Sequence, residues 1–353
     1  MSNNTLSDGV LHNVKSDSFY GVLKTRNIKR VQLGDYEFDT WYGNAAYFMP
    51  LNHTMLGFEY RNLLLKKNEL SIKGLSKSSG LEVAAEGFWI DTLYVCEYCL
   101  KYSSESSSME KHRVVCQMKS PNPQIGKLLY RDEISPYLIR KIRGFEGRRF
   151  CQNLSLFSKL FLDDKSVYYD VDYFDFYVIY GKEELRGSKE SNNDYFKPMG
   201  FFSKEVLSWD VDNNLACICV FPPYQRRHLG SLLIEFSYVL AQEVSRQARS
   251  GPELPLSPYG KVTYLKFWSK KLAYVIASNY GKGDSFTLDN LADETGFRKE
   301  DLLMTLEYMK LLKRDSVTGD VLLLLGNLEQ WCKQNGVDSN QDKGMLNPKY
   351  LVL

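Results

Sequence analysis

The alternation of apolar and polar residues predicts β-structure near the start of the chain. Between residues 19 and 60, apolar side chains recur at alternate positions on both sides of the pair Gly34-Asp35. A glycine-containing pair between two such runs is typical of a β-hairpin. Residues 1–18 lack this pattern and are predicted to form a flexible tail, and 66–82, rich in Lys, Ser and Gly, a loop.

The middle of the chain mixes both periodicities. Apolar residues spaced three and four apart predict helices over 152–163, 230–247 and 266–280. Runs of β-branched and aromatic residues predict strands near 200–203 and 215–221, and a β-hairpin or meander over 166–180. Such a mixture indicates an α+β fold with a twisted sheet.

Residues 285–325 have the pattern helix, turn, helix, strand. Thr287 can cap the first helix and Gly296 can provide the turn. The second helix is lined by Leu302, Leu303, Leu306, Met309 and Leu312. A hairpin wing over 317–321 would complete a winged-helix-like subdomain. A purely structural helical subdomain is the alternative, because the second helix is not notably basic, so direct DNA contact stays open.

Composition narrows the functional classes. The chain has 353 residues and a net charge of only +2, which gives no general attraction to nucleic acid or anionic membranes. No run approaches the roughly 18–20 apolar residues that span a bilayer, and 1–18 has no signal-peptide pattern. We therefore expect an intracellular protein, whose seven cysteines are thiols or metal ligands rather than disulfides.

The run Cys96-x2-Cys99-x12-His112-x3-Cys116 has the spacing of a zinc finger. The first two cysteines would form a knuckle, and the His and Cys near the start of a helix would complete a tetrahedral shell. Four protein ligands make a closed, structural site for Zn²⁺. The alternative, four unrelated buried residues, fits the spacing poorly.

A candidate anion site follows the predicted strand 215–221. The strand ends at Pro222-Pro223, and a polar turn of Gln225, Arg226, Arg227, His228, Leu229, Gly230 and Ser231 leads into a helix. A strand, turn and helix N-terminus aim several backbone N–H groups at one point. Such a point binds a phosphate or pyrophosphate.

This turn resembles the acetyl-coenzyme A loop Q/R-x-x-G-x-G/A of the GCN5-related acyltransferases. Together with the flanking Pro-Pro-Tyr-Gln-Arg-Arg and Leu-Leu-Ile-Glu-Phe-Ser-Tyr runs, it resembles the MYST family of histone acetyltransferases. The runs 151–154 and 200–205 match this family as well, and the resemblance covers roughly residues 20 to 330. It implies a GNAT-like core with a mixed twisted sheet, between a Cys-Cys-His-Cys finger and a winged-helix-like subdomain.

The resemblance also implies which residues bind acetyl-coenzyme A. They are Ile218, Cys219, the loop residues 225–231 and Ser257, with Lys261 a weaker candidate. His228 stands where the family has Gly. A Cβ at this position would obstruct the backbone's approach to the pyrophosphate, or be tolerated if φ stays negative. An ordinary surface imidazole is the alternative to a phosphate contact.

Two catalytic roles follow from the same resemblance. Glu253 matches the family's catalytic glutamate, and the chemistry requires such a base because a lysine amine is protonated at neutral pH. Cys217 matches the active-site cysteine, either as a transient acetyl acceptor or as a neighbour of the substrate amine. A buried cysteine that only packs is the alternative for Cys217, and Cys219 shares its face.

Lys165 matches the lysine that the family acetylates on itself. An exposed cation at the end of a helix is the alternative interpretation.

The runs 251–260 and 214–227 resemble, within the family, catalytic subunits of the SAS (something about silencing) type. That implies acetylation of the histone H4 tail, at its sixteenth residue, by a nuclear protein acting at silencing boundaries. The implied partners are the non-catalytic subunits of a SAS-like complex, with chromatin assembly factors as further candidates. The competing hypothesis is a non-catalytic chromatin adaptor on a degenerate core, which His228 favours.

The chain is accordingly divided into six parts. We expect a tail at 1–18, a β segment at 19–90, the zinc finger at 91–120, the acetyltransferase core at 121–265, a helical or winged-helix-like subdomain at 266–335 and a tail at 336–353.

Overall fold

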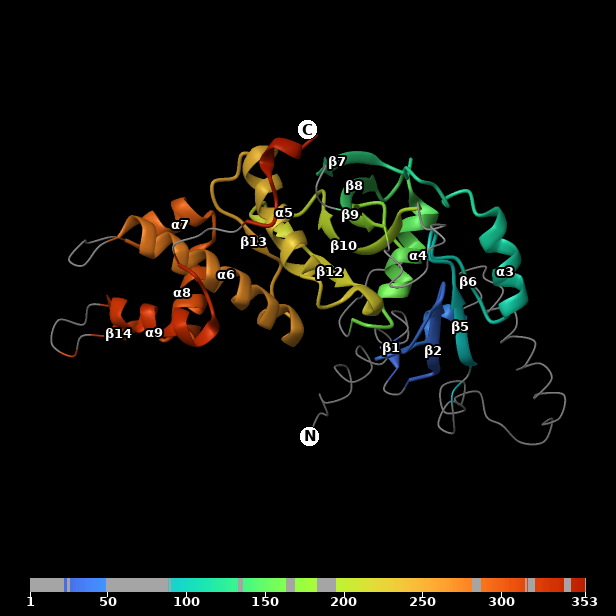
Figure 1. Ribbon diagram of the computed structural model, residues 1–353, viewed down its shortest axis with the longest axis horizontal. Coiled ribbons are helices and arrows are strands. Elements are labelled where there is room, and N and C mark those ends of the chain that lie inside the picture. Colours follow the sequence, from blue (N-terminus) through green and yellow to red (C-terminus); the bar gives the residue numbers. More distant parts are fainter. Residues whose placement is uncertain are drawn as a thin grey trace, which may run out of the picture.

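A five-stranded sheet lies at the centre of the chain (Figure 1). We use a computed structural model, which describes residues 22–23, 26–48, 88, 90–132, 136–162, 169–182, 195–280, 287–314, 316, 321–339 and 344–352. In spatial order the strands of this sheet are β12 (Cys217–Val220), β10 (Lys197–Glu205), β9 (Phe174–Gly181), β8 (Tyr137–Arg143) and β7 (Lys127–Arg131). All four pairings between them are antiparallel.

Parallel pairing occurs outside this sheet. A second, four-stranded sheet has the order β3 (Tyr36–Asp39), β2 (Ile28–Leu33), β5 (Ile90–Val95) and β6 (Tyr102–Ser103), and β2 runs parallel to β5. The hairpin predicted at Gly34-Asp35 is confirmed, since Leu33 pairs with Tyr36 and Gly34 has a φ of +58°. A positive φ of this size suits glycine. The chain therefore mixes both kinds of pairing, but the central sheet is antiparallel rather than mixed.

The helices gather at both ends of the central sheet. They are α3 (Ser106–Val115), α4 (Arg148–Ser158), α5 (Leu229–Glu243), α6 (Pro258–Asn279), α7 (Leu288–Thr295), α8 (Lys299–Tyr308) and α9 (Leu325–Asn335). Figure 1 shows α6 to α9 on one side, and α3 with the N-terminal strands on the other. Among the described residues, every helix is too short or too polar to cross a membrane.

The remaining elements are short. They are β1 (Val22–Leu23), β4 (Gly43–Asn44), η1 (Ala45–Phe48), β11 (Asn213–Leu215), η4 (Pro222–Tyr224), β13 (Gly251–Pro252), β14 (Leu312–Arg314), β15 (Val321–Leu323) and η5 (Pro348–Tyr350). The last described residues return to the core, where the backbone N–H groups of Met345 and Leu346 donate to Glu235 of α5. Val352 N donates to Leu129 O at 2.8 Å, which fastens this segment to β7.

Two predicted helices have different bounds in the structure. The helix predicted over 152–163 is α4, which begins at Arg148 and ends at Ser158, although Phe161 beyond its end still packs in the core. The helix predicted from 266 begins at Pro258. Ser257 caps it, and a Ser-Pro pair is an N-terminal helix signal that apolar periodicity alone misses.

The β-hairpin or meander predicted over 166–180 is confirmed in part. Residues 169–173 contain no strand, and β9 starts at Phe174. It pairs antiparallel with β8 and β10, the strands before and after it along the chain, so the segment supplies one strand of a meander-like order and not a hairpin of its own. Aromatic residues in 169–180 favour a strand. Val171, however, lies in the irregular segment before β9, where its side chain is buried. The helix–turn–helix–strand order predicted over 285–325 is confirmed, with Thr287 capping α7 and Gly296 ending it at φ +73°. The predicted wing lies mostly outside the described residues.

Aromatic packing joins the central sheet to its helices. Phe157 of α4 contacts Phe221 edge-on at a ring distance of 4.9 Å, and Tyr177 stacks on Phe202 at 4.5 Å. The C-terminal helices form a second buried cluster around Trp268, whose indole N–H donates to the Tyr238 hydroxyl at 2.8 Å. The two clusters meet along α5, which contributes residues to both.

Arg298 joins the C-terminal helices to a short parallel strand pair. In this pair β11 lies beside β13, with Asn213 opposite Gly251 and Leu215 opposite Pro252. The Arg298 guanidinium donates to Pro252 O at 2.6 Å and to Asn213 Oδ1 at 3.2 Å. It also donates to the fully buried Asp301 at 2.9 Å. A Cβ on Gly251 would lie 2.3 Å from Asp301 Oδ2, so only glycine fits there.

The four predicted zinc ligands come together, which confirms the grouping expected from their spacing. The ligand atoms of Cys96, Cys99, His112 and Cys116 all lie within 4.8 Å of one another. The sulfur atoms of Cys96 and Cys116 are 3.8 Å apart, which is about the separation of two sulfurs bound at 2.3 Å to a tetrahedral zinc. The donor set and this spacing fit a structural Zn²⁺.

One detail of the finger differs from the prediction. His112 lies in the last turn of α3 and Cys116 follows its end, rather than lying near its start. The finger is held to the neighbouring sheet by Arg113, which donates to Glu97 at 2.7 Å and to Asp35 at 3.2 Å. The helix thus enters the site with its C-terminal end.

We predict that Arg298→Met lowers the free energy of unfolding by about 3–5 kcal/mol, because it leaves the Asp301 carboxylate buried without its partner. Arg249→Met is the matched control, since Arg249 pairs only with the exposed Asp289 and Asp293. That control should cost about 0–1 kcal/mol. Urea unfolding of both variants checks this, and equal losses would contradict a special role for the buried pair.

We predict that His112→Ala abolishes zinc binding and lowers the melting temperature, because structural zinc contributes directly to folding. Native mass spectrometry and thermal unfolding measure the two effects, with one zinc per wild-type chain expected from the one cluster that the described residues contain. Cys332→Ser is the control, because Cys332 is a buried cysteine outside the cluster. Zinc retained by the His112 variant would contradict the assignment.

Candidate active site

A cleft of about 750 Å³ opens where β11 continues into β12 and β13 turns away. Its size is in the range of ordinary small-molecule sites. One wall is β12 with the loop after it and the start of α5, and the opposite wall is the segment 252–260 with the start of α6. Trp41 closes one end, where its ring lies 5.8 Å from Phe161 and 5.9 Å from Tyr259.

The predicted anion loop forms part of this cleft. Gln225, Arg226, His228, Leu229, Gly230 and Ser231 all line it. The Gln225 side chain donates to Val220 O at 3.0 Å and so fastens the loop to the end of β12. Helix α5 starts at Leu229, and the first N–H groups of a helix have no partner within it. The arrangement suits an anionic group held by backbone N–H groups.

His228 has a left-handed backbone conformation. Its φ is +61° and its ψ is 9°, and Arg226 in the same loop also has a φ of +61°. The condition that φ stays negative at position 228 is therefore not met. A side chain at such a φ costs about 1–2 kcal/mol relative to glycine. The imidazole gives α5 no side-chain cap hydrogen bond.

Gly230 has room for a side chain as far as the protein is concerned. The nearest atom to a Cβ placed there would be Thr263 Cγ2 at 3.8 Å, which is an ordinary contact. The chain's own packing therefore does not require glycine at this position. A bare backbone here leaves space in the cleft for a ligand.

Two other candidates lie outside the cleft wall. Arg227 is not part of the cleft wall, and its guanidinium stands 5.7 Å from the centre of the buried Tyr224 ring. Lys261 follows the first turn of α6, where its N–H donates to Ser257 O, and it is also outside the cleft wall. Lys165 lies outside the described residues.

The edge strand β12 offers backbone groups to the cleft. Phe221 N donates to Met199 O, and the pairs Cys219–Phe201 and Cys217–Ser203 follow at steps of two. Since hydrogen-bonded pairs alternate in an antiparallel ladder, the N–H groups of Ile218 and Val220 point away from β10. They face the unpaired edge, on the side where Gln225 binds Val220 O.

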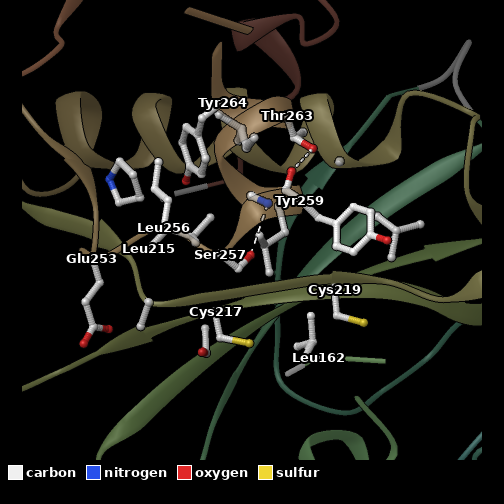
Figure 2. A pocket seen from close by; sticks show the side chains of 18 of the residues that line it. Leu162, Leu215, Cys217, Cys219, Glu253, Leu256, Ser257, Tyr259, Thr263 and Tyr264 are labelled. Atoms are coloured by element: carbon white, nitrogen blue, oxygen red, sulfur yellow. Dashed lines mark hydrogen bonds between the residues drawn. The ribbon is translucent and has the colours of Figure 1, made fainter. Parts of the chain in front are cut away.

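Both cysteines of β12 line the cleft, but to different degrees. Cys217 is half-buried and Cys219 is 5% exposed. Figure 2 shows the two sulfur atoms along the same strand, with Glu253 further along the cavity. Access therefore favours Cys217 over Cys219 for a reactive role.

Glu253 is positioned by the parallel strand pair. It directly follows β13, and its N–H donates to Leu215 O at 2.8 Å, two residues before Cys217. Although Glu253 keeps access to solvent, partial burial of its carboxyl raises its pKa above the ordinary value. The carboxylates of Glu205 and Asp210 raise this pKa further. A carboxylate with a raised pKa in a cleft is suited to accepting a proton.

Ser257 combines a structural contact with a place in the cleft. Its Oγ accepts from Gly260 N at 3.1 Å and caps α6, which leaves the hydroxyl proton available to a ligand (Figure 2). The sequence analysis did not single out Trp41 or Tyr264, which also line the cleft. The Tyr264 hydroxyl is buried and has no hydrogen-bond partner among the described residues. No spacing signal marks either residue, because tertiary packing brings them to the site.

Comparison with known proteins places the chain in a family. The family model described as MOZ/SAS matches residues 122–351. The chain is 39% identical over 342 residues to histone acetyltransferase SAS2 of Saccharomyces cerevisiae, covering 96% of this chain and 89% of that protein. It is 32% identical to the Tip60 homologue of Caenorhabditis elegans, over 74% of this chain and 54% of that protein.

A third relative is histone acetyltransferase MOF of Drosophila melanogaster, which is 33% identical over 83% of this chain and 29% of its own length. The chain thus spans most of the yeast relative but about half or less of the other two. These matches confirm the resemblance to MYST acetyltransferases of the SAS type. The chain belongs to the MOZ/SAS family.

Proposed function

We propose that the chain transfers the acetyl group of acetyl-coenzyme A to a lysine of the histone H4 tail, with Glu253 as the general base. As a member of the MOZ/SAS family with SAS2 as a relative, the chain is a histone acetyltransferase. The observation that carries the residue assignment is one cleft bounded by a helix N-terminus, an open strand edge and the Glu253 carboxylate. These are the three parts that acyl transfer to an amine requires.

Coenzyme binding uses the loop 225–231. The pyrophosphate lies against the N–H groups at the start of α5, where the helix dipole favours negative charge. Gly230 permits close approach, and Ser257 donates its hydroxyl from the opposite wall. The acetyl thioester then extends along β12, beside Ile218 and Cys219.

Proton removal precedes attack. Glu253 accepts a proton from the lysine ammonium, and the neutral amine attacks the thioester carbon. The Ile218 N–H, on the open edge of β12, stabilises the oxyanion that forms. The tetrahedral intermediate then collapses, the carbon–sulfur bond breaks, and coenzyme A leaves as a thiolate that takes the remaining proton of the nitrogen. In the second chemical route the Cys217 thiol gives up its proton and displaces coenzyme A to form an acetyl thioester, from which the lysine amine takes the acetyl group and releases the thiol. The half-buried position of Cys217 in the cleft supports this route.

The wider assignments rest on the family. We propose a GNAT-like core over 121–265, with the finger at 91–120, a winged-helix-like subdomain over 266–335, and autoacetylation of Lys165. Partners are the non-catalytic subunits of a SAS-like complex, and the protein works in the nucleus on chromatin. Zinc has a structural role, held by the finger's four ligands, and takes no part in the transfer.

The test is acetyl transfer from labelled acetyl-coenzyme A to a histone H4 tail peptide, by the chain alone and with SAS-type subunits. Glu253→Gln should lower kcat by about 10²- to 10⁴-fold, since general base catalysis contributes that much. Coenzyme binding, followed by calorimetry, should persist in the variant. Wild-type kcat in Glu253→Gln would contradict the assignment of the base.

The pH dependence of the rate tests the same group. A base acts only when deprotonated, so its raised pKa places the acidic limb of kcat/KM above the range of an ordinary glutamate. Glu205→Gln removes one of the carboxylates that raise this pKa, and its acidic limb should lie at lower pH. An acidic limb that does not move would place the titration on another group.

We predict that His228→Gly tightens acetyl-coenzyme A binding by roughly fivefold, because relief of about 1 kcal/mol of left-handed strain favours the loop conformation that binds. His228→Ala is the matched control, since it keeps the Cβ and removes only the imidazole. Calorimetric Kd values separate the two. Equal tightening by Ala would assign the effect to the imidazole instead.

A further inference from the structure

The loop between β10 and β11 exposes an unusual amount of apolar surface. Its seven residues, 206–212, include four large apolar side chains, and Trp209 is 99% exposed. The others are Val206, Leu207 and Val211. A cluster of exposed apolar side chains in one short segment marks an interaction site more often than a single one does.

Hydrogen bonds hold the backbone of this loop in place. Val206 N donates to Tyr173 O at 2.9 Å, and Asn213 N donates to Asp210 O at 3.1 Å. The Gln247 side chain donates to Val211 O. On the other side, Gly251 N donates to Asp212 O at 3.0 Å. A loop fixed in this way presents its side chains in a defined arrangement at little further entropic cost on binding.

The loop lies at the Glu253 end of the cleft. It directly follows Glu205, which lines the cleft, and Asp212 holds the glycine two residues before Glu253. The Asp210 carboxylate is one of the charges that raise the pKa of Glu253. Leu254, next to the proposed base, is 49% exposed. The hydrogen bond from Gly251 N to Asp212 O therefore places the end of the loop beside the segment that carries Glu253 and Leu254.

The charged side chains of residues 205–225 are all acidic. Residues 205–225 contain the carboxylates of Glu205, Asp210 and Asp212 and no Lys, Arg or His. Arg249, close to the contact residue Gln247, is engaged by Asp289 and Asp293. An exposed indole between carboxylates suits a cation with an aliphatic stem, because the ring face attracts the charge and the ring covers the methylenes.

We propose that the 206–212 loop is a docking surface for the substrate's basic residues beside the reactive lysine. Trp209 takes a Lys or Arg side chain of the peptide on its face, and Asp210 and Asp212 pair with neighbouring cations. This inference rests on the proposed function, since it names how that site selects a cationic peptide. The exposed side chains of Leu207 and Leu254 cover the aliphatic stems of the bound Lys or Arg side chains.

The test measures binding of a fluorescein-labelled histone H4 tail peptide to the full chain by anisotropy. Trp209→Ala should raise the Kd by about fivefold to tenfold, from the lost cation–π contact and lost coverage of the stem. Asp210→Asn with Asp212→Asn should flatten the rise of Kd with salt concentration. Tyr308→Ala is the matched control, an exposed aromatic on α8, and should bind like wild type.

Transfer to Nα-acetyl-lysine methylamide, which has a free ε-amine but no neighbouring residues, separates this inference from the proposed function. The ratio of kcat/KM for the tail peptide to that for this small amine should fall about fivefold in Trp209→Ala. If Trp209→Ala binds the tail peptide with the same Kd as the wild-type chain, the proposal of a docking surface is overturned. Loss of a SAS-type subunit from the complex with unchanged peptide binding also overturns it. Absence of transfer to either substrate by the wild-type complex instead refutes the proposed function.

Discussion

The structure of the active cleft depends on one buried ion pair, between Arg298 and Asp301. Strand β12 belongs to the central antiparallel sheet, whereas β13 pairs with β11 in a separate two-stranded sheet, and the cleft lies between β12 and the segment that follows β13. Because β12 and β13 share no hydrogen-bond ladder, another contact has to fix their relative positions. Arg298 supplies it by binding Pro252 O and Asn213 Oδ1 together. Asp301, fully buried, fixes the guanidinium that does this.

The contacts of Arg298 also connect the C-terminal helices to the segment that carries Glu253. Glu253 directly follows Pro252, and its N–H donates to Leu215 O. The position of Glu253 relative to β12 therefore depends on the register of β11 and β13. That register is held from α8, a helix far along the chain. The helical region therefore helps to fix the position of Glu253.

Much of the fold followed from the sequence, and the exceptions share a cause. The hairpin at Gly34-Asp35 and the helix that ends at Gly296 were predictable because turn and cap chemistry is local. The pairing of β9 with β8 and β10 was not, because strand partners are chosen by tertiary packing. The anion loop 225–231 was predicted from its strand–turn–helix pattern and Glu253 through family resemblance, whereas Trp41 and Tyr264 carry no local signal and reach the cleft only through folding.

One arrangement of carboxylates can serve both recognition and catalysis. Glu205 and Asp210 raise the pKa of Glu253, which makes it a stronger base, and the same negative charge attracts a lysine-rich peptide. The two effects oppose each other once the substrate arrives, since an ammonium beside Glu253 lowers its pKa again. After proton transfer the Glu253 carboxyl is neutral, so the negative charges of Glu205 and Asp210, which raise its pKa, favour the protonated carboxyl and the neutral amine. In the proposed binding mode Trp209 takes the other cations of the peptide, so that only the reactive lysine lies beside Glu253.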